Sequence, residues 1–196
     1  MPARIHARTL VLVVTSVVVA VMATLLGTIP AQAQPRPGVP MAPSTSGYAI
    51  GDSVMLGARS QLRKRGFVVN AAVSRQSYSG PAMVRKRALS LPRALVVHLG
   101  TNGTFPLDTC RRIVTNAGIT RKVYLVTVAV PRSWERSNNR VIRRCAASFP
   151  AGRVTVVDWK GLVSRHRAWL TSDGFHLRPD GAVGYARLIA RTVAGG

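Results

Sequence analysis

Two short segments of the chain carry the side chains that acyl-transfer chemistry requires. Ser53 follows Gly51 and Asp52, directly after an apolar run and before a segment with helical spacing. A serine between a strand and a helix exposes its hydroxyl to substrate and places its backbone N–H near a developing oxyanion. Serine and aspartate are also common helix N-caps, so this tripeptide alone does not identify a nucleophile.

An acid and an imidazole lie together near the C-terminus, in the sequence DGFH at 173–176. Serine catalysis needs a base that accepts the hydroxyl proton and a carboxylate that orients this base. The chain has only six acidic residues and four histidines, and one of each falls in this segment. We therefore predict Ser53, His176 and Asp173 as nucleophile, base and orienting acid, with Asp158 as the alternative acid.

Two further residues are candidates for stabilising an oxyanion. Asn102 lies in the sequence HLGTNG at 98–103, where its amide N–H can point at substrate, although Asn-Gly is also an ordinary turn. The backbone N–H of Ser74 follows another apolar run and is the second candidate. We expect Asp52 to brace its loop and His98 to be a core residue. This chemistry needs no metal and no organic cofactor.

The elements that must position these residues alternate along the chain. Apolar, β-branched runs indicate strands, and the segments between them have the spacing of amphipathic helices. Nearly continuous apolar strands that alternate with helices predict an α/β domain with a five-stranded, parallel, doubly wound sheet of flavodoxin-like topology. We expect strands at 48–50, 67–73, 94–99, 122–130 and 154–159, and helices at 54–64, 82–89, 109–117, 134–147 and 182–193.

The order of these motifs resembles the SGNH (GDSL-type) hydrolase family over most of the domain. Residues 51–53 resemble its first block, residues 100–102 its third and residues 173–176 its fifth. The resemblance implies Ser53 as nucleophile, and the Ser53 and Ser74 backbone N–H groups with Asn102 as oxyanion donors. The family normally has glycine where Ser74 stands, and the forms GTNG and VSRQ are similar to extracytoplasmic SGNH domains of bacterial surface-polysaccharide and peptidoglycan O-acetyltransferases.

The expected function is that of an exported serine esterase or acyltransferase acting through an acyl-Ser53 intermediate. Its substrates would be ester groups, O-acetyl above all, of small molecules or of cell-envelope carbohydrate, and water or a sugar hydroxyl would accept the acyl group. The formal net charge of +22 also allows association with anionic polymers. The alternative is a catalytically inactive basic module that binds anionic cell-wall polymers. We do not expect a nucleic-acid partner.

The first forty residues predict export. Basic residues precede an apolar stretch that ends near the small-x-small sequence AQA at 31–33, which is typical of a signal peptide at 1–33. The apolar stretch is also almost long enough for an uncleaved membrane anchor. A Pro-rich linker at 34–46 and a catalytic domain at 47–196 follow. Outside the cytoplasm, Cys110 and Cys145 are expected to form a disulfide.

Overall fold

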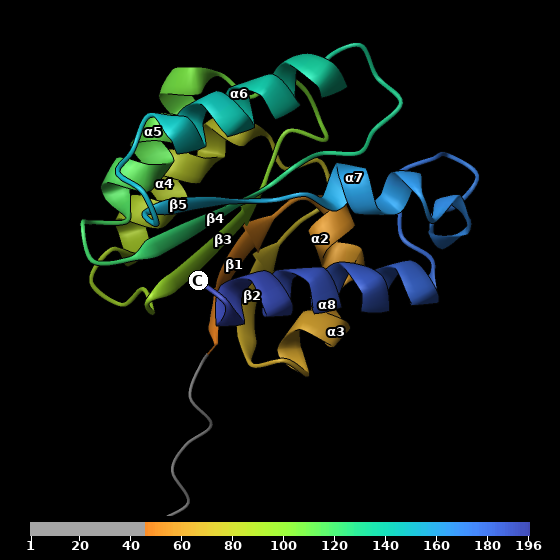
Figure 1. Cartoon of the computed structure of the whole chain (residues 1–196), viewed down its shortest axis with the longest axis horizontal. Helices are drawn as coiled ribbons and strands as arrows, with labels where there is room; N and C mark the ends of the chain where they lie inside the picture. Colours follow the sequence, from red (N-terminus) through yellow and green to blue (C-terminus); the bar gives the residue numbers. More distant parts are fainter. Residues whose placement is uncertain (1–45) are drawn as a thin grey trace, which may run out of the picture. The chain divides into compact units, whose positions relative to one another are not determined.

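The computed structural model describes residues 46–196 of the chain. The predicted leader at 1–33 and residues 34–45 of the predicted linker lie outside the described residues. The first described element is a strand that begins at Gly47. All elements below belong to this one folded unit, which Figure 1 shows in ribbon form.

A five-stranded sheet forms the centre of the domain. All its strands are parallel, and they lie in the order β2-β1-β3-β4-β5. This order confirms the predicted doubly wound, flavodoxin-like topology, in which ligands bind beyond the carboxyl ends of the strands where the winding reverses, between β1 and β3. The strands are β1 Gly47–Gly51, β2 Phe67–Ala71, β3 Ala94–His98, β4 Lys122–Val126 and β5 Val154–Val157.

Helices cover both faces of the sheet, as Figure 1 shows. This double coverage explains why every residue of β1 and of β3 is buried and why these strands are apolar without alternation. One face carries the helices α2 Ser53–Gly57, α3 Arg59–Arg63, α7 Trp159–Ser164 and α8 Pro179–Ala194. The other carries α4 Gly80–Arg87, α5 Leu107–Asn116 and α6 Glu135–Ala147. Short 3-10 turns occur at Ser77–Ser79 and Arg167–Trp169.

The α2/α7/α8 face includes a group of aromatic side chains in contact with one another. Trp159 and Tyr185 are fully buried, with their rings edge to face at a centroid separation of 5.1 Å. Burial of one such side chain contributes about 2 kcal/mol. Trp169 packs on α8 at Gly181 and Gly184, and a Cβ at either glycine would collide with it. The glycines therefore let the 167–169 turn lie directly against the last helix.

The other face is reinforced covalently. A disulfide joins Cys110 of α5 to Cys145 of α6, and both residues are fully buried. The two helices are thereby linked across 35 residues of sequence. Such a crosslink restricts the unfolded chain more strongly than the folded one.

Two of the predicted elements are interrupted in the structure. The helix expected at 54–64 is divided at Ala58, whose N–H bonds to the Met55 carbonyl, because Gly57 is a poor helix former. The strand expected at 154–159 ends at Val157, and Trp159 instead begins α7, which the sequence analysis missed. The Asp158 carboxylate caps α7 by accepting the Gly161 N–H at 3.3 Å.

Smaller differences affect the strand ends and the last helix. The strands β2 and β4 end two and four residues earlier than their apolar runs, at Ala71 and Val126, because the chain turns there into loops at the carboxyl edge. The helix α8 begins at Pro179, a residue well suited to a first helical turn. Within residues 46–196, no helix is both long and apolar enough to cross a lipid bilayer.

Candidate active site

Ser53 lies at the carboxyl end of β1, where the strand passes into α2. The preceding residue, Asp52, is fully buried and acts as the N-cap of α2. Its carboxylate accepts the N–H of Val54 at 3.1 Å and the N–H of Thr101, in the loop after β3, at 3.3 Å. These bonds confirm that Asp52 braces the loop, and they fix Ser53 relative to the neighbouring strand.

His176 and Asp173 lie on one hydrogen-bonded loop before α8. One oxygen of the Asp173 carboxylate accepts three bonds, from the Thr171 hydroxyl at 2.7 Å and from the N–H groups of Phe175 and His176, both at 3.0 Å. The Thr171 N–H in turn bonds to the His176 carbonyl at 2.9 Å. Gly174 has a φ of +81°, a conformation that favours glycine, so the sequence DGFH suits this tight turn.

The loop brings the predicted triad into one continuous relay. Asp173 Oδ2 lies 2.6 Å from His176 Nδ1, and His176 Nε2 lies 3.1 Å from Ser53 Oγ. Both distances are within hydrogen-bond range, and the two ring nitrogens face different partners. An imidazole held in this way can accept a proton from the serine hydroxyl while the carboxylate faces its other N–H.

The Asp173 carboxylate is stabilised in its charged form. Partial burial alone would raise its pKa, but the hydrogen bonds from Phe175, His176 and Thr171 outweigh burial and hold the pKa of Asp173 well below its usual value. Its side chain is still 40 % exposed, and that of His176 is 42 % exposed. The acid and the base are therefore open to solvent and to substrate.

Asp158, the alternative acid, has different partners. Its carboxylate accepts the Thr127 hydroxyl at 3.1 Å and the Arg143 guanidinium at 3.1 Å, besides capping α7. These contacts assign it a structural position at the end of β5, whereas Asp173 is the carboxylate on His176.

The candidate oxyanion donors lie on the loops that follow β2 and β3, the two strands that flank β1. Ser74 is exposed and has a φ of +54°, the left-handed conformation that glycine adopts more easily. Asn102 donates one amide N–H to the Arg75 carbonyl at 3.3 Å. The amide carries a second N–H, which is the one that an oxyanion could use.

Arg75 holds the β2 loop in place and was missed by the sequence analysis. Its guanidinium donates to the Gly51 carbonyl at 3.0 Å and to the Asn70 side chain at 2.9 Å. It thus ties the loop of Ser74 to the end of β1, two residues before the nucleophile. The sequence gives one signal only, an arginine in the loop after a strand, which is too common to single out.

Asn138 supports the β3 loop from the opposite face of the sheet and was also missed. Asn138 belongs to α6, and its side chain is buried. This side chain accepts the Phe105 N–H at 2.8 Å and donates to the carbonyls of Gly100 at 2.9 Å and Gly103 at 2.8 Å. The segment that carries Asn102 is therefore held at both ends by one amide. No spacing in the sequence connects residue 138 to residue 102.

His98 is a buried core residue, as predicted, but only half of its ring is paired. Nδ1 lies 2.8 Å from the Tyr185 hydroxyl, whereas Nε2 has no partner among the described residues. Burial lowers the pKa of His98, and the Asp52 carboxylate opposes this only in part. Burial also raises the pKa of Tyr185, so both groups are neutral.

Comparisons with known proteins identify relatives of this chain. No family model matches the chain. In sequence, the chain is 34% identical over 149 residues to a peptidoglycan O-acetyltransferase, OatA, of Listeria monocytogenes, covering 74% of this chain and 23% of that protein. It is 29% identical to an O-acetyltransferase OatA of Staphylococcus aureus over 76% of this chain and 25% of that one. The chain thus spans about a quarter of the length of these curated relatives.

Solved structures show the same fold. The C-terminal catalytic domain of Streptococcus pneumoniae OatA, a peptidoglycan O-acetyltransferase, has a TM-score of 0.63 at 24% identity, with 76% of this chain and 89% of that chain covered. A lipase/acylhydrolase from Enterococcus faecalis has a TM-score of 0.58 at 17% identity, with 76% and 95% covered. At these identities the structural likeness establishes the fold.

Proposed function

Because the described domain is a member of the SGNH (GDSL-type) hydrolases, homologous to one part of the OatA-type peptidoglycan O-acetyltransferases, we propose that it is an acyl-transferring serine enzyme with Ser53 as nucleophile. Its substrates are O-acetyl esters, including those of cell-envelope carbohydrate. The observation that supports this most directly is the unbroken relay from Asp173 through His176 to Ser53, at 2.6 and 3.1 Å.

In the proposed first half-reaction, Ser53 Oγ attacks the carbonyl carbon of the ester and its proton passes to His176 Nε2. The carbonyl oxygen becomes an oxyanion, which the free Asn102 N–H and the backbone N–H groups of Ser53 and Ser74 stabilise. Each such donor typically contributes about 3 kcal/mol. Collapse of the intermediate breaks the bond to the leaving alcohol, which takes the proton from His176 and leaves acetyl-Ser53.

In the second half-reaction, an acceptor hydroxyl replaces the leaving alcohol. The oxygen of the acceptor hydroxyl attacks the acetyl carbon while His176 Nε2 takes the proton of that hydroxyl. His176 then gives this proton to Ser53 Oγ as the bond between Ser53 and the acetyl group breaks. Water as acceptor gives acetate, and a sugar hydroxyl gives a new O-acetyl ester. The Asp173 carboxylate faces the imidazolium that exists in each half-reaction and lowers its free energy.

The remaining parts of the proposal concern the whole chain. We propose that residues 1–33 export the domain, that residues 34–46 link it to this leader, and that it works outside the cytoplasm on envelope carbohydrate. Sequence similarity to a peptidoglycan O-acetyltransferase supports this substrate class. The high positive charge suits an anionic cell surface.

The test is turnover of p-nitrophenyl acetate by the full chain and its variants. We expect Ser53→Ala and His176→Ala to abolish turnover, whereas the matched controls Ser60→Ala and His166→Ala retain it, since both control side chains are exposed on other elements. A stoichiometric acetyl adduct on Ser53, seen by mass spectrometry after rapid quenching, would identify the intermediate. Equal turnover by Ser53→Ala and the parent would sink the proposal.

Added oligosaccharides then separate transfer from hydrolysis. A sugar acceptor that becomes acetylated, while release of p-nitrophenol continues, identifies a transferase. Release of acetate alone identifies an esterase. A folded wild-type chain that turns over neither acetyl nor longer esters would instead favour the basic binding module.

A further inference from the structure

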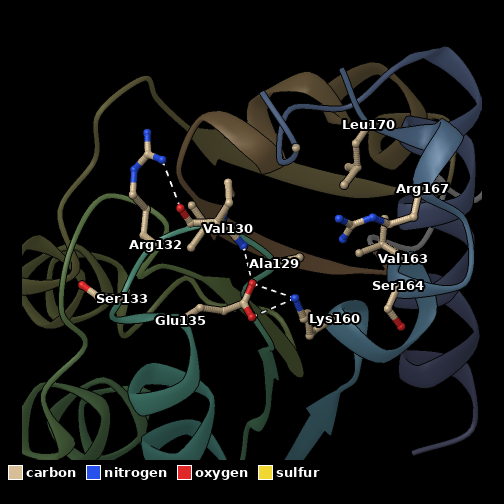
Figure 2. Close-up of a pocket in the computed structure, with 12 residues that line it drawn as sticks. Ala129, Val130, Arg132, Ser133, Glu135, Lys160, Val163, Ser164, Arg167 and Leu170 are labelled. Atoms are coloured by element: carbon tan, nitrogen blue, oxygen red, sulfur yellow. Dashed lines mark hydrogen bonds and ion pairs between the residues drawn. The ribbon is translucent and has the colours of Figure 1, made fainter. Parts of the chain in front are cut away.

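The two edges of the sheet differ in charge. The chain has only six acidic residues, and all lie at the carboxyl edge, where the strands end and the helices that follow them begin. They are Asp52, Asp108, Glu135, Asp158, Asp173 and Asp180. Cations near that edge can pair with them, as Lys160 does with Glu135 at 2.8 Å (Figure 2). The opposite edge, which we call the amino edge, has no acidic side chain.

Basic side chains gather at the amino edge, where helices end and strands begin. Lys86 and Arg87 are exposed in the last turn of α4, and the exposed Arg93 lies directly before β3. None of these three has a carboxylate at ion-pair distance among residues 46–196. Exposed cations also end α3, at Lys64, and α8, at Arg191. Cations are favourable at helix C-termini, and here they leave a surface of one sign.

Two large apolar side chains project from the same edge. Leu89 is 100% exposed in the loop between α4 and β3, and Ile119 is 92% exposed in the loop between α5 and β4. The two loops are neighbours, because the Lys122 N–H after one bonds to the Arg93 carbonyl at the end of the other at 2.8 Å. Exposed apolar side chains among cations suit a partner that offers both anionic and apolar groups.

A cavity of about 640 Å³ opens next to Leu89. Its lining includes no carboxylate and consists of Tyr48, Asn70, Met83, Lys86, Arg87 and Ser90. The Arg87 guanidinium lies over the Tyr48 ring, 4.9 Å from its centroid. Lysine, arginine and serine are donors to phosphate oxygens. The cavity can therefore hold a phosphate group while Leu89 extends beside it.

The chain enters the domain at the amino edge. The strand β1 begins there at Gly47, and the Ser46 N–H bonds to the Gly66 carbonyl at 2.9 Å. The apolar stretch of the predicted leader ends before residue 34, and residues 34–46 span at most about 45 Å when fully extended. A leader held in a membrane would thus tether the domain by the edge that carries the exposed apolar side chains.

We propose that the amino edge is a docking surface for an anionic lipid bilayer, with its cations on lipid phosphates and Leu89 and Ile119 inserted below the headgroups. A soluble anionic polymer would also attract the cations, but it offers no apolar phase to these two side chains. The proposal goes beyond the proposed function, because it involves no triad residue. The five-residue strands place the triad about 16 Å farther from the lipid, on the edge that faces away from it.

The first measurement is the contact of single side chains with lipid. Leu89→Trp and Ile119→Trp are made in the full chain and reconstituted in vesicles of phosphatidylcholine with brominated acyl chains, with or without phosphatidylglycerol. The matched control is Val73→Trp, since Val73 is 69% exposed at the carboxyl edge, in the loop after β2. The leader and the three native tryptophans are the same in every chain, so the parent gives the background.

We expect bromine to quench the fluorescence that Leu89→Trp and Ile119→Trp add, in the vesicles that contain phosphatidylglycerol. The fluorescence that Val73→Trp adds should stay unquenched in both kinds of vesicle. Absence of quenching at positions 89 and 119, or equal quenching at position 73, would overturn the proposal.

The second measurement separates this surface from the general attraction of a very basic chain for anions. One triple variant, made in the Leu89→Trp chain, removes cations of the amino edge: Lys86→Gln/Arg87→Gln/Arg93→Gln. Its control removes the same charge from exposed positions at the carboxyl edge: Arg132→Gln/Arg136→Gln/Arg178→Gln. Each cation at an anionic lipid surface contributes about fivefold to binding. The docking equilibrium should therefore fall about 100-fold in the first variant and far less in the control, and equal losses would contradict the proposal.

Soluble polyphosphate tests the other occupant, an anionic polymer. Leu89→Ser, made in the Ile119→Trp chain, should weaken docking on the anionic vesicles about tenfold and leave polyphosphate binding unchanged. Unchanged docking of this variant would assign the surface to a polymer and reject the bilayer. Docking is measured without substrate, so a chain that docks but does not hydrolyse p-nitrophenyl acetate would retain this surface and reject the proposed function.

Discussion

The two faces of the sheet are built for different tasks. The α2/α7/α8 face holds the elements that carry Ser53 and His176, and its reacting groups are partly exposed and held by hydrogen bonds. The α4/α5/α6 face holds no triad residue and is crosslinked by the buried Cys110–Cys145 disulfide. The contrast indicates that the proposed chemistry and the covalent reinforcement lie on different faces of the sheet, so we expect most changes to affect one without the other.

The largest expected effect is on the α2/α7/α8 face. Asp173→Asn should lower kcat/KM by about 10⁴-fold, because an amide no longer selects the reactive tautomer of His176. The free energy of unfolding should change by less than about 1 kcal/mol, since the side chain is partly exposed. Ester hydrolysis and urea unfolding measure the two quantities. A loss of activity below tenfold would exclude Asp173 as the orienting acid.

The next largest effect is expected on the α4/α5/α6 face, where a change should lower stability and leave activity unchanged. Cys110→Ala/Cys145→Ala should reduce the free energy of unfolding by about 4 kcal/mol, the chain-entropy value for a 35-residue separation. kcat/KM should stay at the wild-type value wherever the variant is folded. Thermal unfolding with and without reductant checks the stability change. Lost activity in a folded variant would show that the two faces are coupled.

A change at Asn138 should affect both stability and activity, because this residue of α6 holds the loop of Asn102 from the other face of the sheet. Asn138→Ala should cost about 3 kcal/mol of stability through the unpaired groups that it leaves buried. It should also lower kcat/KM about tenfold, a fraction of what one oxyanion donor contributes.

The neighbouring residue is the control for this prediction. Asn139 makes two comparable bonds, both at 2.8 Å, but to Val128 in the loop after β4. Asn139→Ala should destabilise the fold to a similar degree and keep kcat/KM. Equal kinetic effects of the two variants, measured below their unfolding temperatures, would mean that Asn138 has no particular link to the site.

The smallest expected effect is the pH dependence of stability due to Asp173. Its pKa in the folded state lies below that in the unfolded chain, so the ionised carboxylate stabilises the fold above about pH 4. This contribution is lost as the pH falls from there through the folded-state pKa. Solvent screening keeps it below about 1 kcal/mol. The melting temperatures of wild type and Asp173→Asn should therefore converge on acidification, and a constant difference would contradict the assignment.

The sequence predicts those parts of the fold and site that depend on short contiguous patterns. The five strands are recognisable because both faces of the sheet are covered and the strands are apolar throughout. The proposed triad can be predicted because Ser53 follows a strand and because the acid and the base lie within four consecutive residues. In both cases the local sequence carries the physical cause of the structure.

The remaining features depend on packing between distant segments. Asn138 and Arg75 act on loops through side chains that no periodic pattern singles out. The boundary at 157 was missed because Trp159 continues the apolar run, and only the bonds of the Asp158 carboxylate show where the strand ends and α7 begins. Leu89 and Ile119 lie 30 residues apart and project from neighbouring loops only in the folded chain.

The placement of Asp173 and His176 on a single loop has a mechanical consequence. The bonds within residues 171–176 make that loop one body, in which the 2.6 Å contact between acid and base is internal. Within the triad, a displacement of the loop against α2 therefore lengthens the contact of His176 with Ser53 and leaves that of Asp173 with His176 unchanged. An intact acid–base pair is therefore not enough to place the base on the serine, which also depends on how residues 171–176 pack against the rest of the domain.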